Sequence, residues 1–234
     1  MKFAVANPEF EAEKLYGYIK NVTRSFDDFM FTKLKIKISR EIYNSIKSGK
    51  NEIELKEELT RVIKTNKKKR LEIERNLPKI RDDWKKIEGR LFSTIKELTG
   101  RKVDKNFTCQ FLTAYRSGGY EDKTNRIWIY YDRKKKFWGV THELLHIHCW
   151  KIWNKLFKNC TWGESWKFSE VYVELLLRDT TLSFIIPKEE RKLKFWKEVE
   201  PMAKKVIPLW QKRNSFEEFL VESFKKLKLK GKLK

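Results

Sequence analysis

The residues best suited to metal chemistry lie in one short stretch of the chain, His142-Glu143-Leu144-Leu145-His146. Two histidines four residues apart share one face of a helix, so both imidazoles can reach the same tetrahedral zinc ion. Bound zinc lowers the pKa of its water from 15.7 to about 7, and an adjacent carboxylate can take the proton while the oxygen attacks a carbonyl. The stretch therefore predicts that His142 and His146 bind Zn²⁺ and that Glu143 is a general base.

A catalytic zinc ion usually has three protein ligands and one open position, so a third ligand must come from elsewhere. Three acidic residues follow the motif, Glu164, Glu170 and Glu174. Glu170 and Glu174 share one helical face, so one carboxylate can bind the metal while the other accepts a hydrogen bond from the far nitrogen of a ligand histidine. We expect Glu170 as the third ligand and Glu174 as the supporting carboxylate, with Glu174 and then Glu164 as alternative ligands.

These two segments together resemble the gluzincin branch of zinc metallopeptidases, the thermolysin-like and peptidase-MA-like families. In those families one helix provides both histidines and the general base, and a later helix provides the ligand glutamate, which segment 168–174 matches. The resemblance covers about residues 105–180, and it departs from many gluzincins at Val171, where they carry glycine. It implies peptide-bond hydrolysis with catalytic and zinc-binding residues at His142, Glu143, His146 and Glu170.

Other polar residues near the motif have less specific interpretations. His148 points away from the ligand face and is expected to be structural or exposed to solvent. Cys149 lies on the ligand face but about 10.5 Å from His142 along the helix axis, too far to bind the same ion, so we expect a small buried side chain. The sequence leaves the donor to a developing oxyanion open among three residues, Tyr115, Tyr172 and Arg178.

The elements that must position these residues are mainly helices, because glycine and proline are scarce. In the first hundred residues we expect a helix opened by Asn7 and Pro8, a helix over 26–46 and two further helices, 52–76 and 78–99. Segment 33–38 also alternates in a strand-like way, but the four-residue apolar period favours a helix. Pro78 restarts the last helix and Gly100 ends it.

The period changes near residue 105, where 107–115 and 126–131 alternate like strands and predict an antiparallel β-hairpin. Helices are expected over 137–156 and 166–179, and Pro187, Pro201 and Pro208 punctuate more helices near the C-terminus. The fold class is therefore α+β, mainly α. The resemblance implies a minimal zincin-like fold, with a small antiparallel sheet packed on the motif helix. We expect a helical N-terminal region, residues 1–104, and a catalytic domain, residues 105–234.

The formal net charge of +22 raises the question of a nucleic-acid partner. Lysine outnumbers arginine 40 to 14 and the charge is spread evenly, whereas base and phosphate recognition favour the arginine fork. We therefore expect a peptide or protein substrate rather than nucleic acid. No apolar run is long enough for a membrane span, the N-terminus has no secretory signal, and three cysteines make no disulfide framework. These features predict a soluble, cytoplasmic protein with no membrane partner.

Two alternatives remain open at the level of sequence. One is a basic, nucleic-acid-associated protein whose metal site is structural or non-catalytic. The other is a zincin that acts on proteins bound to nucleic acid. Neither the oligomeric state nor the cleavage specificity follows from the residues.

Overall fold

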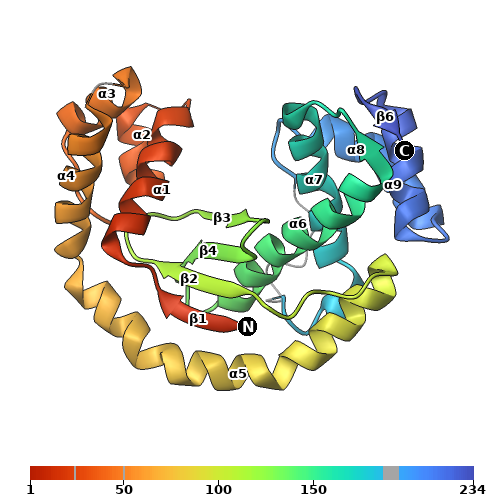
Figure 1. The fold of residues 1–234 in the computed structure, drawn as a ribbon, viewed down its shortest axis with the longest axis horizontal. Coiled ribbons are helices and arrows are strands. Elements are labelled where there is room, and N and C mark those ends of the chain that lie inside the picture. Colours follow the sequence, from red (N-terminus) through yellow and green to blue (C-terminus); the bar gives the residue numbers. More distant parts are fainter. Residues whose placement is uncertain (24, 50, 187–194) are drawn as a thin grey trace. The chain divides into compact units, whose positions relative to one another are not determined.

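The computed structural model describes residues 1–23, 25–49, 51–186 and 195–234, and it is mainly helical with small β-sheets (Figure 1). The expected α+β, mainly α class is therefore confirmed. The chain forms two compact units whose segments alternate along the sequence. The first comprises Met1–Asp82, Thr108–Gly119 and Arg126–Arg133, and the second comprises Asp83–Phe107, Tyr120–Asn125 and Lys134–Lys234. The predicted domain boundary after residue 104 lies within the second unit.

A four-stranded sheet has the strand order β1-β2-β4-β3. Its strands are β1 (Lys2–Val5), β2 (Thr108–Leu112), β3 (Gly118–Glu121) and β4 (Arg126–Tyr130). β2 lies between β1 and β4 (Figure 1) and pairs in parallel with both. Cys109 lies opposite Phe3 on one side and Ile127 on the other. The predicted antiparallel hairpin is wrong, because the residues after β2 form a third strand before the chain returns alongside β2. Side-chain alternation indicates a strand but carries no information about its direction.

The first unit also contains four short helices, α1 (Pro8–Asn21), α2 (Phe26–Thr32), α3 (Arg40–Ser48) and α4 (Glu52–Lys64). The Asn7 side chain accepts a hydrogen bond from the Phe10 N–H at 2.7 Å, which confirms the predicted start of α1. The predicted continuous helix over 26–46 is wrong, because the chain leaves the helix at Lys33. The Lys35 N–H donates to the Ala114 carbonyl oxygen at 2.7 Å instead. Within 33–38 the structure has a single β-bridge, between Leu34 and Tyr115, and no strand.

One buried carboxylate connects α1 to the end of β2. Glu11 is fully buried, and its Oε1 atom accepts hydrogen bonds from the N–H groups of Thr113 and Ala114, each at 2.5 Å. The Thr113 hydroxyl donates to the other carboxylate oxygen at 3.0 Å. Burial raises the pKa of Glu11, and these hydrogen bonds oppose the shift. The contacts fix the position at which β2 leaves the sheet.

Helix α5 (Lys67–Thr99) is long and runs through Pro78. The predicted break between 76 and 78 is therefore wrong. A proline inside a helix removes one backbone hydrogen bond, but Ile73 and Ile80 on either side of it are buried, so packing holds both flanks of the helix. Gly100 has φ +71°, a left-handed conformation that ends the helix as expected.

The second unit is built on α6 (Lys136–Leu156) and α7 (Trp162–Leu177), which pack against each other. Two more helices follow, α8 (Glu200–Lys212) and α9 (Phe216–Leu227). β5 (Phe157–Lys158), between α6 and α7, pairs antiparallel with β6 (Lys232–Leu233) at the end of the chain. Pro201 lies in the first turn of α8 and Pro208 lies inside it, whereas Pro187 lies outside the described residues. No helix in the described part of the chain has the length and apolar character needed to cross a bilayer.

Candidate metal centre

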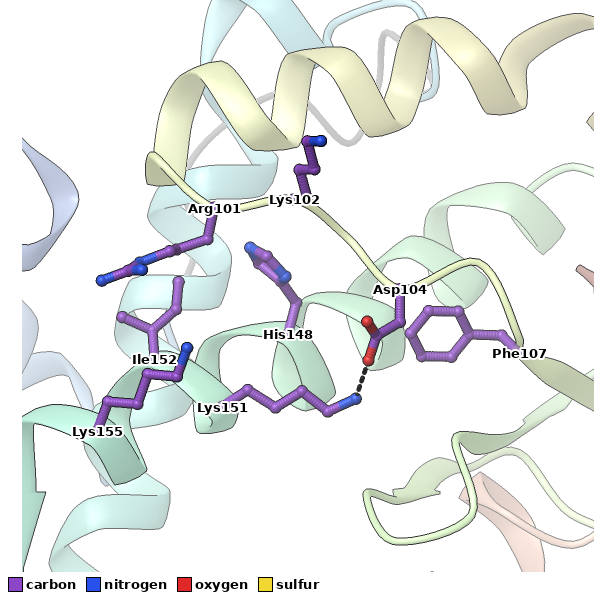
Figure 2. Close-up of a pocket in the computed structure, with 8 residues that line it drawn as sticks. All are labelled: Arg101, Lys102, Asp104, Phe107, His148, Lys151, Ile152 and Lys155. Carbon is purple, nitrogen blue, oxygen red and sulfur yellow. Dashed lines mark hydrogen bonds and ion pairs between the residues drawn. The ribbon is translucent and has the colours of Figure 1, made fainter.

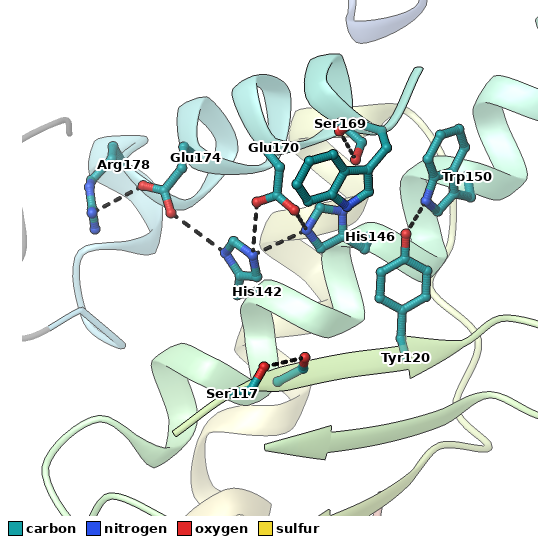
Figure 3. A network of polar contacts seen from close by, with 11 residues as sticks. Ser117, Tyr120, His142, His146, Trp150, Ser169, Glu170, Glu174 and Arg178 are labelled. Carbon is teal, nitrogen blue, oxygen red and sulfur yellow. Dashed lines mark hydrogen bonds and ion pairs between the residues drawn. The ribbon is translucent and has the colours of Figure 1, made fainter. Parts of the chain in front are cut away.

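Helices α6 and α7 bring three side chains with metal-binding atoms together (Figure 3). His142 and His146 lie on successive turns of α6, and Glu170 faces them from α7. The two Nε2 atoms are 3.1 Å apart. The carboxylate oxygens of Glu170 lie 3.5 Å from Nε2 of His142 and 3.4 Å from Nε2 of His146. The four-residue spacing thus puts both imidazoles on one face, and the pairing of the two helices adds the carboxylate.

The two separations to Glu170 involve its two different oxygens, and one ligand atom from each of the three side chains lies within 4.8 Å of the others. The group is therefore close to the size of a tetrahedral metal site. Ligand atoms about 2.0–2.1 Å from a tetrahedral ion lie roughly 3.3 Å from one another. In the part of the chain that the structure describes, no other group of three His, Cys, Asp or Glu side chains brings its ligand atoms this close. Two imidazoles and one carboxylate are also a donor set of catalytic zinc sites. The residues present therefore fit Zn²⁺.

A second carboxylate supports His142 from behind. Nδ1 of His142 lies 3.5 Å from Oε1 of Glu174, and the other oxygen of Glu174 lies 3.0 Å from Nη2 of Arg178. Glu174 lies in the last turn of α7 and Arg178 directly follows the helix, and both side chains are largely buried. This chain of contacts orients the imidazole so that Nε2 faces Glu170 and His146 (Figure 3).

Two opposing effects determine the protonation of the site's side chains: their burial and their contacts with one another. Burial raises the pKa of Glu170, but its contacts with His142 and His146 outweigh that effect and hold the pKa at about 2. Burial lowers the pKa of His142, but Glu170 and Glu174 outweigh it and raise this pKa well above its usual value. The pKa of His146 is lowered, because burial outweighs the effect of Glu170. An ionised carboxylate is therefore already in place for a cation.

Glu143 has the protonation behaviour of an acid–base group. Burial raises its pKa to about 7, with the charge of His142 opposing the shift and that of Glu170 adding to it. A carboxyl group with a pKa near neutrality both accepts and returns a proton at little cost. Its position next to His142 on α6 follows directly from the sequence, but the shift in pKa requires the surrounding fold.

Tyr120 is a neighbour of the site that the sequence did not indicate. Its ring stacks on the imidazole of His146, with centroids 5.1 Å apart and planes within 14°. The Trp150 indole N–H donates a hydrogen bond to the Tyr120 hydroxyl (Figure 3). Burial raises the pKa of Tyr120, so the phenol stays protonated. No spacing in the sequence connects β3 to α6, because this contact forms between segments more than 20 residues apart.

The alternative ligand Glu164 lies away from this group. It is exposed in the first turn of α7, where it accepts a hydrogen bond from the Thr161 hydroxyl at 2.7 Å. Among the three residues left open as oxyanion donors, Arg178 contacts Glu174, Tyr172 is fully buried and Tyr115 belongs to the first unit. The structure does not bring Tyr172 into hydrogen-bonding contact with the described ligands.

His148 and Cys149 are both buried and stand apart from the ligand group. His148 borders a separate pocket of about 220 Å³ (Figure 2). Its Nε2 atom lies 2.8 Å from the Thr99 hydroxyl, which donates its own proton to the Ile95 carbonyl oxygen at 2.7 Å, so Nε2–H is the donor to Thr99. Burial lowers the pKa of His148 to about 4, which keeps the imidazole neutral.

Comparisons of the chain with protein-family models, with curated proteins and with solved structures found no match. The chemistry of the site therefore rests on its own side chains. Two imidazoles, one ionised carboxylate and a neighbouring carboxyl group of near-neutral pKa can hold a divalent cation and move a proton beside it.

Proposed function

We propose that this protein is a zinc-dependent metallopeptidase of gluzincin type that hydrolyses peptide bonds. The observation that supports the proposal most directly is the grouping of His142, His146 and Glu170, with one ligand atom from each within 4.8 Å of the others, and with Glu143 adjacent to His142. The α7 segment with Glu170 and, one turn later, Glu174 is similar to the second ligand helix of that branch.

Each residue has a defined task in this proposal. His142, His146 and Glu170 hold the ion, and Glu174 keeps His142 oriented through Nδ1. Zinc, when bound, supplies an acidified water and a polarised carbonyl. Glu143 takes a proton from the attacking water and delivers it to the leaving amine nitrogen. In the metal-free protein, burial raises the pKa of this carboxyl group to about 7.

Two measurements test the proposal, the metal content of the purified protein and peptide hydrolysis by wild type and Glu143→Gln. We expect near-stoichiometric zinc in both proteins and hydrolysis that is lower in Glu143→Gln by about 10²- to 10⁴-fold. Glu164→Gln is the matched control, since it removes the same charge from an exposed position on α7 and should leave hydrolysis unchanged. Absence of zinc would contradict the whole proposal, whereas zinc with equal hydrolysis in all three proteins would contradict only the peptidase activity.

The state of the cysteines supports a cytoplasmic location for this activity. Cys109, Cys149 and Cys160 are all free, and the first two are buried. Free thiols persist in reducing compartments. Detection of the protein in a cytosolic fraction would support the location, and detection only outside the cell would contradict it.

One observation favours a second candidate function, a nucleic-acid-associated protein with a non-catalytic metal site. Four cationic side chains, Arg101, Lys102, Lys151 and Lys155, line the pocket beside His148, together with one carboxylate, Asp104 (Figure 2). This function predicts nucleic-acid binding that weakens steeply with salt, with a log–log slope near −0.9 per phosphate contact. Undetectable DNA and RNA binding at physiological salt would eliminate it.

A further inference from the structure

A second pocket, of about 450 Å³, lies in the same unit as the metal centre. Five aromatic side chains line it, Tyr120, Trp150, Trp153, Phe157 and Trp162. Its lining includes neither Glu143 nor any of the three candidate metal ligands. These aromatic walls provide enough apolar surface to cover a long side chain.

The pocket is joined to the metal centre by two of its lining residues. Tyr120 stacks on the ligand His146 with its ring, and its hydroxyl accepts a hydrogen bond from Trp150 (Figure 3). Trp150 follows His146 by one turn of α6, so the same helix face passes from the metal site into the pocket. A peptide held at the metal could therefore place a neighbouring side chain in the pocket.

One wall of the pocket is an exposed aromatic surface. The Trp162 indole stacks on that of Trp150, with ring centroids 5.5 Å apart and planes within 19°, and Trp162 remains 68 % exposed. Trp153 packs edge-on against Trp150 and is buried. Tryptophan faces attract cations through the negative charge density of the ring, and they also cover methylene groups.

The charge of the lining is opposite to that of the chain as a whole. Glu121 and Asp122 line the pocket with one amine, that of Lys158, so two negative charges face one positive charge. The whole chain carries +22. Asp122 is exposed, while Glu121 is partly buried and accepts a hydrogen bond from the Thr124 hydroxyl at 2.5 Å. Local negative charge in a strongly basic protein favours a cationic occupant.

We infer that this pocket binds the side chain of an arginine or lysine residue of the peptide substrate, next to the bond that the metal centre cleaves. The apolar stem lies against Trp150 and Trp162, and the cation lies between the aromatic faces and the carboxylates of Glu121 and Asp122. This inference rests on the proposed function for the identity of the substrate, but the binding of a cationic side chain does not require hydrolysis.

The test uses alanine-rich peptides that carry a single Arg, Phe or Glu at each position around the cleaved bond. We expect the Arg peptide to have a kcat/KM about tenfold or more above the Phe and Glu peptides at one position. Glu121→Gln with Asp122→Asn should remove this preference, as should Trp162→Ala, which alters an exposed side chain. Glu57→Gln, an exposed substitution in the first unit, is the control and should keep the preference.

Calorimetric binding of the same peptides to Glu143→Gln separates the two proposals. Selective binding of the Arg peptide that is lost in the Trp162→Ala background supports the pocket, even where no peptide is cleaved and the peptidase proposal fails. Cleavage or binding with a preference for Phe, or an Arg preference that survives both the acidic and the Trp162 substitutions, would overturn the inference. Absence of binding by all peptides would also overturn it.

Discussion

Nδ1 of His142 lies 3.5 Å from Oε1 of Glu174, and this contact extends the candidate metal centre beyond its three ligand residues. Glu174 in turn contacts the guanidinium of Arg178 at 3.0 Å. The imidazole is therefore held from behind by a carboxylate whose own position is fixed by a cation. Such contacts determine both the orientation and the basicity of a metal-binding histidine.

Replacement of Glu174 should weaken metal binding without removing a ligand. We expect Glu174→Gln to lower zinc affinity by about 10- to 100-fold, because the amide is less basic than the carboxylate that faces Nδ1. Competition with a chromophoric chelator measures the change. Glu164→Gln is the control on the same helix and should leave affinity unchanged. An equal loss in both variants would mean that the contact with His142 has no special role.

Zinc binding should become weaker as the pH falls. The pKa of His142 in the metal-free protein is raised by Glu170 and Glu174 against the effect of burial, so zinc must displace a proton from this imidazole near neutrality. Proton release on binding means that affinity rises with pH, by up to about tenfold per unit below the raised pKa. Glu170, with a pKa of about 2, adds no dependence in this range. Apparent zinc affinity measured between about pH 6 and 8 checks the slope, and a flat profile would contradict the prediction.

The stability of the protein should fall in mild acid because of His148. Burial lowers its pKa from 6.5 to about 4. Between pH 4 and pH 6.5, His148 is therefore protonated in the unfolded chain and neutral in the folded protein. The contribution of His148 to the free energy of unfolding is fully present above pH 6.5 and is lost as the pH falls toward 4. The loss is roughly 3 kcal/mol, because each pKa unit corresponds to about 1.4 kcal/mol. His148→Gln keeps a donor for Thr99 and should show a shallower acid dependence in urea unfolding. Parallel curves for the two proteins would refute this assignment.

The structure leaves no room for a side chain at Gly119. A Cβ atom at this position would lie 2.6–2.8 Å from the indole of Trp128, which is itself packed edge-on against Phe10 at 5.7 Å between centroids. We expect Gly119→Ala to destabilise the protein by about 1–3 kcal/mol, because the indole must move from its packed position.

The matched control is Gly89→Ala on the exposed face of α5, where an added Cβ meets nothing within 4 Å. It should raise stability by about 0.5–1 kcal/mol through helix propensity and lower backbone entropy in the unfolded chain. Thermal unfolding of both variants compares the two effects. A loss of stability at Gly89 as large as that at Gly119 would show that the contact with Trp128 is not the cause.

Local sequence patterns were sufficient to predict the helices that carry the candidate site. The positions of His142 and His146 on one face of α6, and of Glu170 and Glu174 on one face of α7, follow from 3.6 residues per turn. The start of α1 at Asn7 and the end of α5 at Gly100 follow from capping chemistry in the same way. These features depend only on residues within a few positions of each other, and so they could be predicted from the sequence.

Features that depend on contacts between distant segments could not be predicted in this way, because those contacts form only when the chain folds. The parallel pairing of β2 with β1 and β4, and the helix that continues through Pro78, arise from packing and pairing across the chain, which outweigh weak local preferences. The same holds for the metal centre. Only the packing of α6 on α7 brings Glu170 to the two histidines and leaves Glu164 apart, and only the fold buries Glu143 enough to raise its pKa to about 7. Desolvation and contacts between helices act through space, so no spacing along the chain encodes them.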